Sequence, residues 1–196
     1  LYATGVGGGI SVLTSQKNTS SNWEIVYRGA TEILANGGDI KLLGGQTLSG
    51  SAGISNGTWL FGSTSAIGSK TGSSYVANSS SNITINYDTY NFSGNRSAVK
   101  TTGTVTWDGS GASTTGFGQN VDTSYFTFSG LTGLKIGSLV NTKSISVSTD
   151  ALSIVGPIEL LAMGGTTAQV ILNVGLTNSA NNSFVNLKAA QDVVLY

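Results

Sequence analysis

Residues 145–172 read ISVSTDALSIVGPIELLAMGGTTAQVIL, and this stretch decides the fold. It holds four short segments in which two apolar residues flank a single residue: 145–147, 152–154, 158–160 and 170–172. Because successive side chains of a β-strand point to opposite faces, the outer two residues of each segment share one face. Gly, Pro, Ser and Thr between the segments favour turns. The stretch therefore predicts short strands joined by turns, each strand burying two apolar side chains.

The same kind of triplet recurs along much of the chain. The steps between successive triplets are regular, and the clearest triplets start at Ile83, Val105, Phe126, Ile145, Val170 and Val193. Their mean spacing suits one coil of a parallel β-helix that carries two or three short strands. The sequence thus predicts an all-β parallel β-helix (β-solenoid) of about nine coils of roughly 22 residues. The usual right-handed crossover between parallel strands, and not the spacing, predicts that this β-helix is right-handed.

The pattern places the whole chain, residues 1–196, in a single β-solenoid segment. Only residues 30–36 have helix-forming content, which predicts one or two helical turns at most. Residues 44–130 contain long stretches rich in Gly, Ser and Thr, so we expect longer, protruding loop insertions there.

Composition excludes several classes of function. Nine basic and nine acidic residues cancel and are scattered, so no basic stripe for nucleic acid is present. The longest apolar runs, such as 193–196, are far too short for a membrane-spanning helix, so no membrane insertion is expected. The chain has no His and no Cys, which excludes a Ser-His-Asp triad, a thiol nucleophile and most transition-metal sites. We expect no catalytic residues, no metal and no cofactor.

The two ends of the chain carry no capping pattern. Residues 1–10 contain neither an initiator Met nor a signal segment, and residues 192–196 stop within a strand pattern. Solenoids need capped ends to avoid edge-to-edge association. We therefore expect an internal segment of a much longer chain, with adjacent repeats or identical chains meeting its open solenoid ends.

The middle residue of most triplets is Ser or Thr and is expected to face outward, as at Thr84, Thr106 and Ser146. Near the C-terminus the same position is occupied by Ile171 and Val194. Strands that are apolar on both faces are usually covered on both faces. The sequence therefore predicts a packing or assembly surface that includes Ile171, Val194 and Tyr196.

The last third of the chain resembles a known family. It contains FSGLTGLKIG at 128–137 after Phe126, SIVGPIEL at 153–160, VILN at 170–173 and NLKAAQDV at 186–193. This order is similar to the repeat region of filamentous-haemagglutinin-like bacterial adhesins, in which Gly-Leu-x-Ile-Gly, Gly-Pro-Ile and Asn-Leu-Lys-Ala segments recur. In the first two thirds the resemblance lies mainly in composition and in pieces such as GGDIKL at 37–42.

The resemblance implies a right-handed parallel β-helix stalk within a very large secreted or surface-anchored bacterial protein. It implies export through an outer-membrane partner and an extracellular or cell-surface location. It also implies adhesion, biofilm cohesion or cell-to-cell contact, with a host or neighbouring-cell surface glycan or protein as the partner. No catalytic residues follow from it.

Two alternatives stay open. A polysaccharide-processing β-helix enzyme would need clustered carboxylates, and Asp108 and Asp122 could converge with Asp88 and Arg96. Solvated turn carboxylates are the simpler interpretation of these acids. The other alternative is a trimeric fibre segment of a phage or secreted appendage, with Ile171 and Val194 buried between chains.

Aromatic residues are most frequent between residues 87 and 126. Aromatic faces are good platforms for sugar rings, so Tyr90, Trp107 and Tyr125 are the weak candidates for ligand binding. The competing interpretation is that Trp107 and Phe126 fill the interior of the solenoid.

Overall fold

The computed structural model describes residues 1–13, 23–26, 32–43, 57–61, 66–71, 74–75, 81–87, 89–92, 97–109 and 116–196. In these ranges the regular structure is β-strand, apart from one three-residue 3₁₀ turn at Thr123–Tyr125. The strands are β1 (Tyr2–Leu13), β2 (Trp23–Val26), β3 (Glu32–Leu43), β4 (Gly57–Phe61), β5 (Ala66–Thr71), β6 (Ser74–Tyr75), β7 (Ile83–Asn86), β8 (Thr89–Phe92), β9 (Ser97–Lys100), β10 (Thr104–Asp108), β11 (Val121–Asp122), β12 (Phe126–Ser129), β13 (Gly133–Ser138), β14 (Ile145–Val147), β15 (Leu152–Ile154), β16 (Ile158–Ala162), β17 (Val170–Leu172), β18 (Leu176–Asn178), β19 (Val185–Ala189) and β20 (Val193–Leu195).

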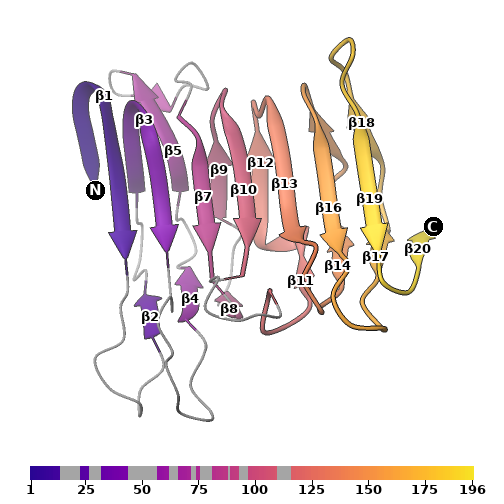
Figure 1. Cartoon of the computed structure of the whole chain (residues 1–196). Coiled ribbons are helices and arrows are strands. Elements are labelled where there is room, and N and C mark those ends of the chain that lie inside the picture. The colour runs from indigo at the N-terminus through magenta and orange to yellow at the C-terminus, as the bar shows by residue number, and fades with distance from the viewer. Residues whose placement is uncertain are drawn as a thin grey trace.

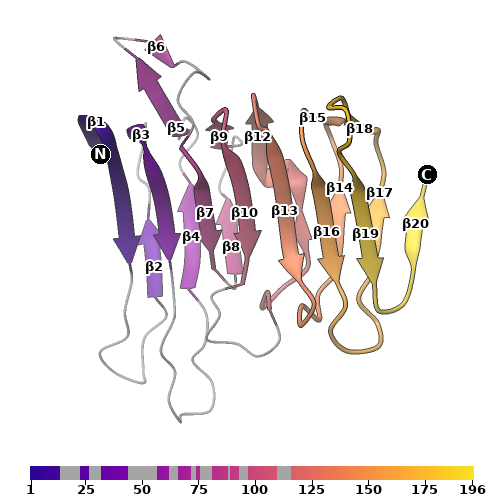
Figure 2. The same cartoon turned by 45° about the horizontal axis from the view of Figure 1, so that its top comes forward.

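The strands stack side by side along one axis, with the two chain ends at opposite ends of the stack (Figure 1). The front face is the parallel ladder β1-β3-β7-β10-β13-β16-β19. The rear face is formed by the first halves of β1 and β3 with β5, β9 and β12, and by the pair β15-β18. The third face comprises β2-β4-β8 and β11-β14-β17-β20. Figure 2 shows the same faces from a tilted view.

Among the described strands, every pairing is parallel except that of β5 with β6. A parallel ladder requires the chain to travel around the molecule before it returns to pair with itself. The last four circuits each contribute one strand to each face: β9-β10-β11, β12-β13-β14, β15-β16-β17 and β18-β19-β20. The chain is therefore an all-β protein with stacked parallel strands, a β-solenoid.

Strand β3 belongs to two faces because it bends in its middle. Its residues 32–35 pair with β5 and its residues 40–43 pair with β7. Gly37 takes a φ of +91° at the bend, which favours glycine. A Cβ on Gly38 would lie 2.4 Å from the backbone oxygen of Gly7 in the neighbouring coil, so this corner has no room for a side chain.

The expected nine coils of uniform length are not confirmed. On the front face Ile83 pairs with Val105 of the next coil, and Ile40 pairs with Ile83. The circuit from Ile40 to Ile83 is almost twice as long as the circuit that follows it. Both circuits form one strand on the third face and one on the rear face, β4 and β5 in the first and β8 and β9 in the second, and the first also contains β6.

The prediction of one or two helical turns over residues 30–36 is wrong for residues 32–36, which belong to strand β3. Residues 30 and 31 lie outside the described residues. Hydrogen bonding between stacked coils outweighs the modest helix propensity of these few residues. An isolated helical turn of this length would gain too little from its own hydrogen bonds to compete with the ladder.

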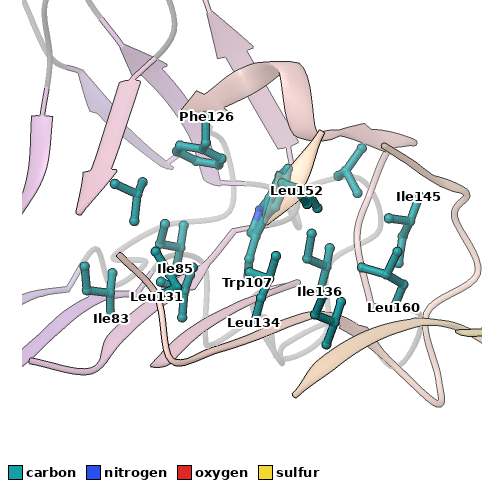
Figure 3. Packing of buried hydrophobic residues seen from close by; sticks show 14 of the residues in the cluster. Ile83, Ile85, Trp107, Phe126, Leu131, Leu134, Ile136, Ile145, Leu152 and Leu160 are labelled. Carbon is teal, nitrogen blue, oxygen red and sulfur yellow. The ribbon is translucent and has the colours of Figure 1, made fainter. Parts of the chain in front are cut away.

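The interior is a column of apolar side chains that runs along the stack (Figure 3). On the front face one inward row contains Ile40, Ile83, Val105, Leu134 and Ile158, all buried. Alternate residues, such as Thr84 and Thr106, are partly exposed, which confirms the predicted outward positions. The alternation in the sequence is thus the alternation between core and solvent.

Polar side chains connect successive coils at the corner before the third face. The Ser144 N–H donates to Asn120 Oδ1 at 3.0 Å, and the Gln169 N–H donates to Ser144 Oγ at 3.1 Å. Gln169 Nε2 then donates to Asp192 Oδ2 at 3.0 Å. The residue before each of β11, β14, β17 and β20 therefore takes part in a ladder of hydrogen bonds parallel to the solenoid axis.

In the described part of the chain, no helix has the length and apolar character needed to span a membrane.

Candidate binding surfaces

Trp107, one of the three aromatic candidates, lies inside the solenoid. Its side chain is fully buried on β10 and contacts Phe126 edge-on at 4.9 Å and Phe117 at 5.8 Å between ring centroids. Figure 3 shows Trp107 and Phe126 within the apolar interior. The interpretation that these two rings fill the core is confirmed, and the face of Trp107 is not accessible to a sugar.

Tyr125 is the aromatic candidate with an accessible part. It ends the 3₁₀ turn, is half-buried, and its ring centroid lies 6.3 Å from that of Trp107. Burial raises the pKa of the Tyr125 hydroxyl, and the nearby carboxylate of Asp122 adds to the effect. Tyr90 lies on β8, where its backbone pairs with Trp59, but its side chain is outside the described part of the structure.

Asp122 has a structural role at the start of this turn. Its Oδ1 accepts the Ser124 N–H at 2.7 Å and the Ser148 hydroxyl of the next coil. The hydroxyl of Thr123, which is buried, in turn accepts the Ser148 N–H at 3.1 Å. Asp122 therefore caps the turn and connects two coils, which is a structural role for a turn carboxylate.

Asp108 has a different environment at the end of β10. Its Oδ1 accepts the Gly109 N–H at 2.8 Å. Burial raises the pKa of the Asp108 carboxyl, although the Gly109 N–H and the positive charge of Lys135 oppose that shift. Asp88 and Arg96, the other members of the conceivable acidic site, lie outside the described residues. Within the residues that the structure describes, no group of three or more Asp or Glu side chains is close enough together to hold a metal ion.

A shallow groove of about 270 Å³ crosses the outer surface of the front face. It is open because Gly133 has no side chain between Thr104 and Pro157. Lys135 Nζ and Glu159 Oε2 lie 4.0 Å apart at its border, with side chains 46% and 28% exposed. The sequence alone does not reveal this groove, because only the register that places β10, β13 and β16 side by side brings its residues together.

The expected assembly residues lie at the outer side of the third face. Ile171 is in register with Ser146 on one side and with Val194 on the other. Ile171 and Val194 are half-buried, whereas Tyr196 is 88% exposed. This row changes from polar to apolar toward β20, as the sequence pattern predicts.

The last coil exposes apolar residues that belong to the interior rows. Val185 is in register with the buried Ile158, and Leu195 is in register with Leu172. Val185 is nevertheless 44% exposed and Leu195 is 69% exposed. The interior row thus continues to the end of the stack, where β18, β19 and β20 form an uncovered apolar surface.

Comparisons with protein-family models, with curated protein sequences and with solved structures gave no match to this chain.

Proposed function

We propose that this chain is a non-enzymatic structural and adhesive segment of a large secreted or surface-anchored bacterial adhesin or extracellular filament. In this proposal the right-handed β-solenoid acts as a stiff rod that holds contact surfaces away from the cell. The single observation that carries the proposal is the continuous parallel ladder on the front face, from β1 to β19, around one apolar interior.

A parallel ladder of this kind suits a stalk. Each coil is held to its neighbours by backbone hydrogen bonds and by stacked side chains, so stiffness comes from the stack as a whole. The cross-coil bonds from Asn120 to Asp192 add polar links along the same axis. The resemblance of the last third to filamentous-haemagglutinin-like repeats supports the same function and an extracellular, cell-surface location.

The partner in this proposal is a glycan or protein on a host or neighbouring cell. Many weak contacts along the rod give strong attachment when several of them form at once. The front-face groove and the exposed part of Tyr125 are two such surfaces, because both combine apolar area with hydrogen-bonding groups.

Attachment to cells of beads that carry this chain tests the proposal. We expect more beads to attach with this chain than with an unrelated solenoid of similar charge. Replacing both Lys135 and Glu159 by Ala should reduce attachment if the groove takes part, whereas the Leu139→Lys variant, changed at an exposed corner residue, is the matched control. Equal attachment by the folded chain and the unrelated solenoid would contradict an adhesive function.

A polysaccharide-processing enzyme is the second candidate, and the environment of Asp108 is the observation that favours it. A partly buried carboxyl whose pKa is raised resembles the general acid that glycoside cleavage requires. If this candidate is correct, the chain lowers the viscosity of an acidic or neutral polysaccharide solution and the Asp108→Asn variant does not. If the viscosity stays constant with the folded chain across a panel of polysaccharides, the enzymatic alternative is wrong.

A further inference from the structure

The groove on the front face is built within the body of the stack. Its floor is Gly133 on β13, which lies between Thr104 of one neighbouring coil and Pro157 of the other. The three strands that carry the groove, β10, β13 and β16, each pair with a strand on both sides (Figure 1). The walls of the groove are therefore complete within these coils, and the groove opens outward from the sheet.

Polar side chains stand in line along one side of this groove. Thr106 is in register with Lys135, and Lys135 is in register with Glu159, so the three residues occupy one outward row on adjacent strands. Neighbouring strands lie about 4.7–4.9 Å apart, which sets the spacing of the row. A threonine hydroxyl donates and accepts, a lysine ammonium donates, and a carboxylate accepts. The groove thus offers hydrogen-bond donors and acceptors within the span of one small ligand.

The two charged groups keep hydrogen-bonding capacity for a ligand. Lys135 Nζ and Glu159 Oε2 lie 4.0 Å apart, a separation longer than a hydrogen bond. An ammonium has three donor positions and a carboxylate about four acceptor positions, so even a closer contact between the two would leave most of them open. Both groups therefore remain able to bind the hydroxyls of a ligand that lies beside them.

The charge of the groove is balanced, and this balance selects the class of ligand. Among the residues that line the groove, only Lys135 and Glu159 are charged, and their charges cancel. An anion would be attracted by the ammonium and repelled by the nearby carboxylate, and a cation would meet the reverse. A neutral molecule with several hydroxyls meets neither repulsion, since its hydroxyls accept from Lys135 and donate to Glu159. The groove is therefore complementary to a neutral polyhydroxylated ligand.

The rest of the lining suits the face of a ring. Pro157 is exposed on the side of the groove opposite the polar row, and Gly133 leaves the space between them empty. A pyranose sugar has C–H groups on its faces and hydroxyls around its edge, so it matches an apolar wall beside a polar row. The volume of the groove, about 270 Å³, is slightly smaller than the roughly 300–1,000 Å³ of pockets for drug-sized ligands, which suits a single ring.

From these features we infer that the groove over Gly133 binds one neutral sugar ring of a cell-surface glycan. Lys135 donates to one ring hydroxyl, Glu159 accepts from another, and Pro157 contacts a C–H face of the ring. This inference rests on the proposed adhesive function, and it names the class of ligand for one of the contact surfaces.

Fluorescence anisotropy of labelled oligosaccharides measures the binding. The neutral probes are short oligomers of mannose, galactose or glucose, the acidic probe is oligogalacturonate, and the basic probe is a chitosan oligomer. We expect the unchanged chain to bind at least one neutral oligomer more tightly than both charged probes. We expect this affinity to change little between low and physiological salt, because salt screens charges and the ligand has none.

Two substitutions test the groove itself. Gly133→Ala places a Cβ on its floor, 3.1 Å from Thr104 Cγ2, and should weaken binding of the neutral oligomer by about tenfold or more, as one extra methyl group in a fitted site does. Lys135→Ala leaves the floor unchanged and removes a donor, so it should weaken binding roughly 3- to 10-fold. Gly175→Ala and Lys188→Ala are the matched controls, because they make the same changes outside the groove and should leave the affinity unchanged.

Three results would overturn the inference. The first is a folded chain that binds no neutral oligomer more tightly than an unrelated solenoid does, and the second is a charged probe that binds more tightly than every neutral oligomer. The third is unchanged affinity in the Lys135→Ala and Gly133→Ala variants, which would place the sugar elsewhere. The circular dichroism spectrum of each variant must match that of the unchanged chain. If Gly133→Ala does not fold, Lys135→Ala decides the test, because Lys135 is exposed.

Attachment of beads to cells separates this inference from the proposed function. A chain that attaches beads to cells but binds none of the oligosaccharides would overturn the sugar ligand and leave the adhesive function supported. If the Gly133→Ala change also abolished that attachment, the ligand of the groove would be a protein. A chain that binds a neutral oligomer through the groove but attaches to no cell would support the inference and contradict the adhesive function.

Discussion

Gly156 shows how closely successive coils approach at a corner. It precedes Pro157, and a Cβ built on it would lie 1.7 Å from the backbone oxygen of Thr132 in the preceding coil. Real side-chain atoms do not come that close to a carbonyl oxygen, so any residue other than glycine would push the two coils apart. The Gly-Pro-Ile segment of the sequence therefore marks a contact between coils.

We expect the Gly156→Ala variant to be less stable than the unchanged chain by roughly 1–3 kcal/mol, the usual effect of overpacking. Gly175→Ala is the control, because the nearest atom to a Cβ at Gly175 is the Ala151 Cβ at 3.8 Å, an ordinary contact. Urea denaturation followed by circular dichroism measures both. Equal loss of stability in the two variants would mean that the close approach at Thr132 has no effect.

Asp108 gives a pH dependence whose sign follows from its environment. Its pKa is raised in the folded chain because burial disfavours the charged form. The folded state therefore binds a proton more tightly than the unfolded state does, and ionisation of Asp108 destabilises the fold at neutral pH. This destabilisation is absent below the ordinary pKa of the carboxyl and is complete above the raised pKa.

Replacing Asp108 by Asn keeps an oxygen for the Gly109 N–H and removes the charge. We expect the variant to be more stable than the unchanged chain at pH 7, and the difference to disappear as the solution is acidified through the titration range of Asp108. Denaturation curves at several pH values measure the difference. A difference that grows on acidification would contradict the assigned cause.

Within a strand, the alternation of buried and exposed side chains determines which residues contribute most to stability. Ile136 on β13 is fully buried, while its neighbour Lys135 is exposed and lies 4.0 Å from Glu159. We expect Ile136→Ala to reduce stability by about 2–5 kcal/mol, because it leaves a cavity in a packed interior.

The adjacent Lys135→Ala change should alter stability by about 1 kcal/mol or less, since exposed ion pairs contribute little. Thermal and urea unfolding of the two variants provide the comparison. Similar losses for both variants would mean that β13 does not separate core from solvent as described.

The positions of the strands could be predicted from the sequence, because the three residues of a triplet are enough to indicate a strand and its buried face. The predicted triplets 145–147, 152–154, 170–172 and 193–195 coincide with β14, β15, β17 and β20. Spacing was harder to interpret. The triplets at Val105, Phe126 and Ile145 lie on the front, rear and third faces respectively, so their regular separation is not the length of a coil.

The candidate surfaces were less predictable than the strands. The burial of Trp107 was the exception, because Trp107 ends the triplet 105–107 and so was expected to face inward, where it shares the row of Ile85 and Ile136. The groove at Gly133 arises from three strands whose residues lie far apart in the sequence.

For the whole molecule, stacking makes local stability depend on position. Each coil has neighbours on both sides except at the ends of the stack, so the terminal coils lose half of their contacts. In dilute solution we expect amide hydrogens of β13 and β16 to exchange slowly and those of β19 and β20 to exchange faster. Hydrogen exchange followed by mass spectrometry measures this gradient. Uniform protection from β13 to β20 would contradict a nearest-neighbour stack.

The direction of the hydrogen bonds between coils determines how the rod responds to force. In a ladder of stacked coils these bonds point along the axis, so a pull on the two ends loads every interface between coils in series. The weakest coil then peels away first, and the remaining coils stay folded. One coil of the front face runs from Leu134 to its partner Ile158, and the next runs from Ile158 to Val185. Each such coil, once released and fully extended, would lengthen the chain by roughly 80–95 Å. Under tension the solenoid would therefore extend in steps, one coil at a time.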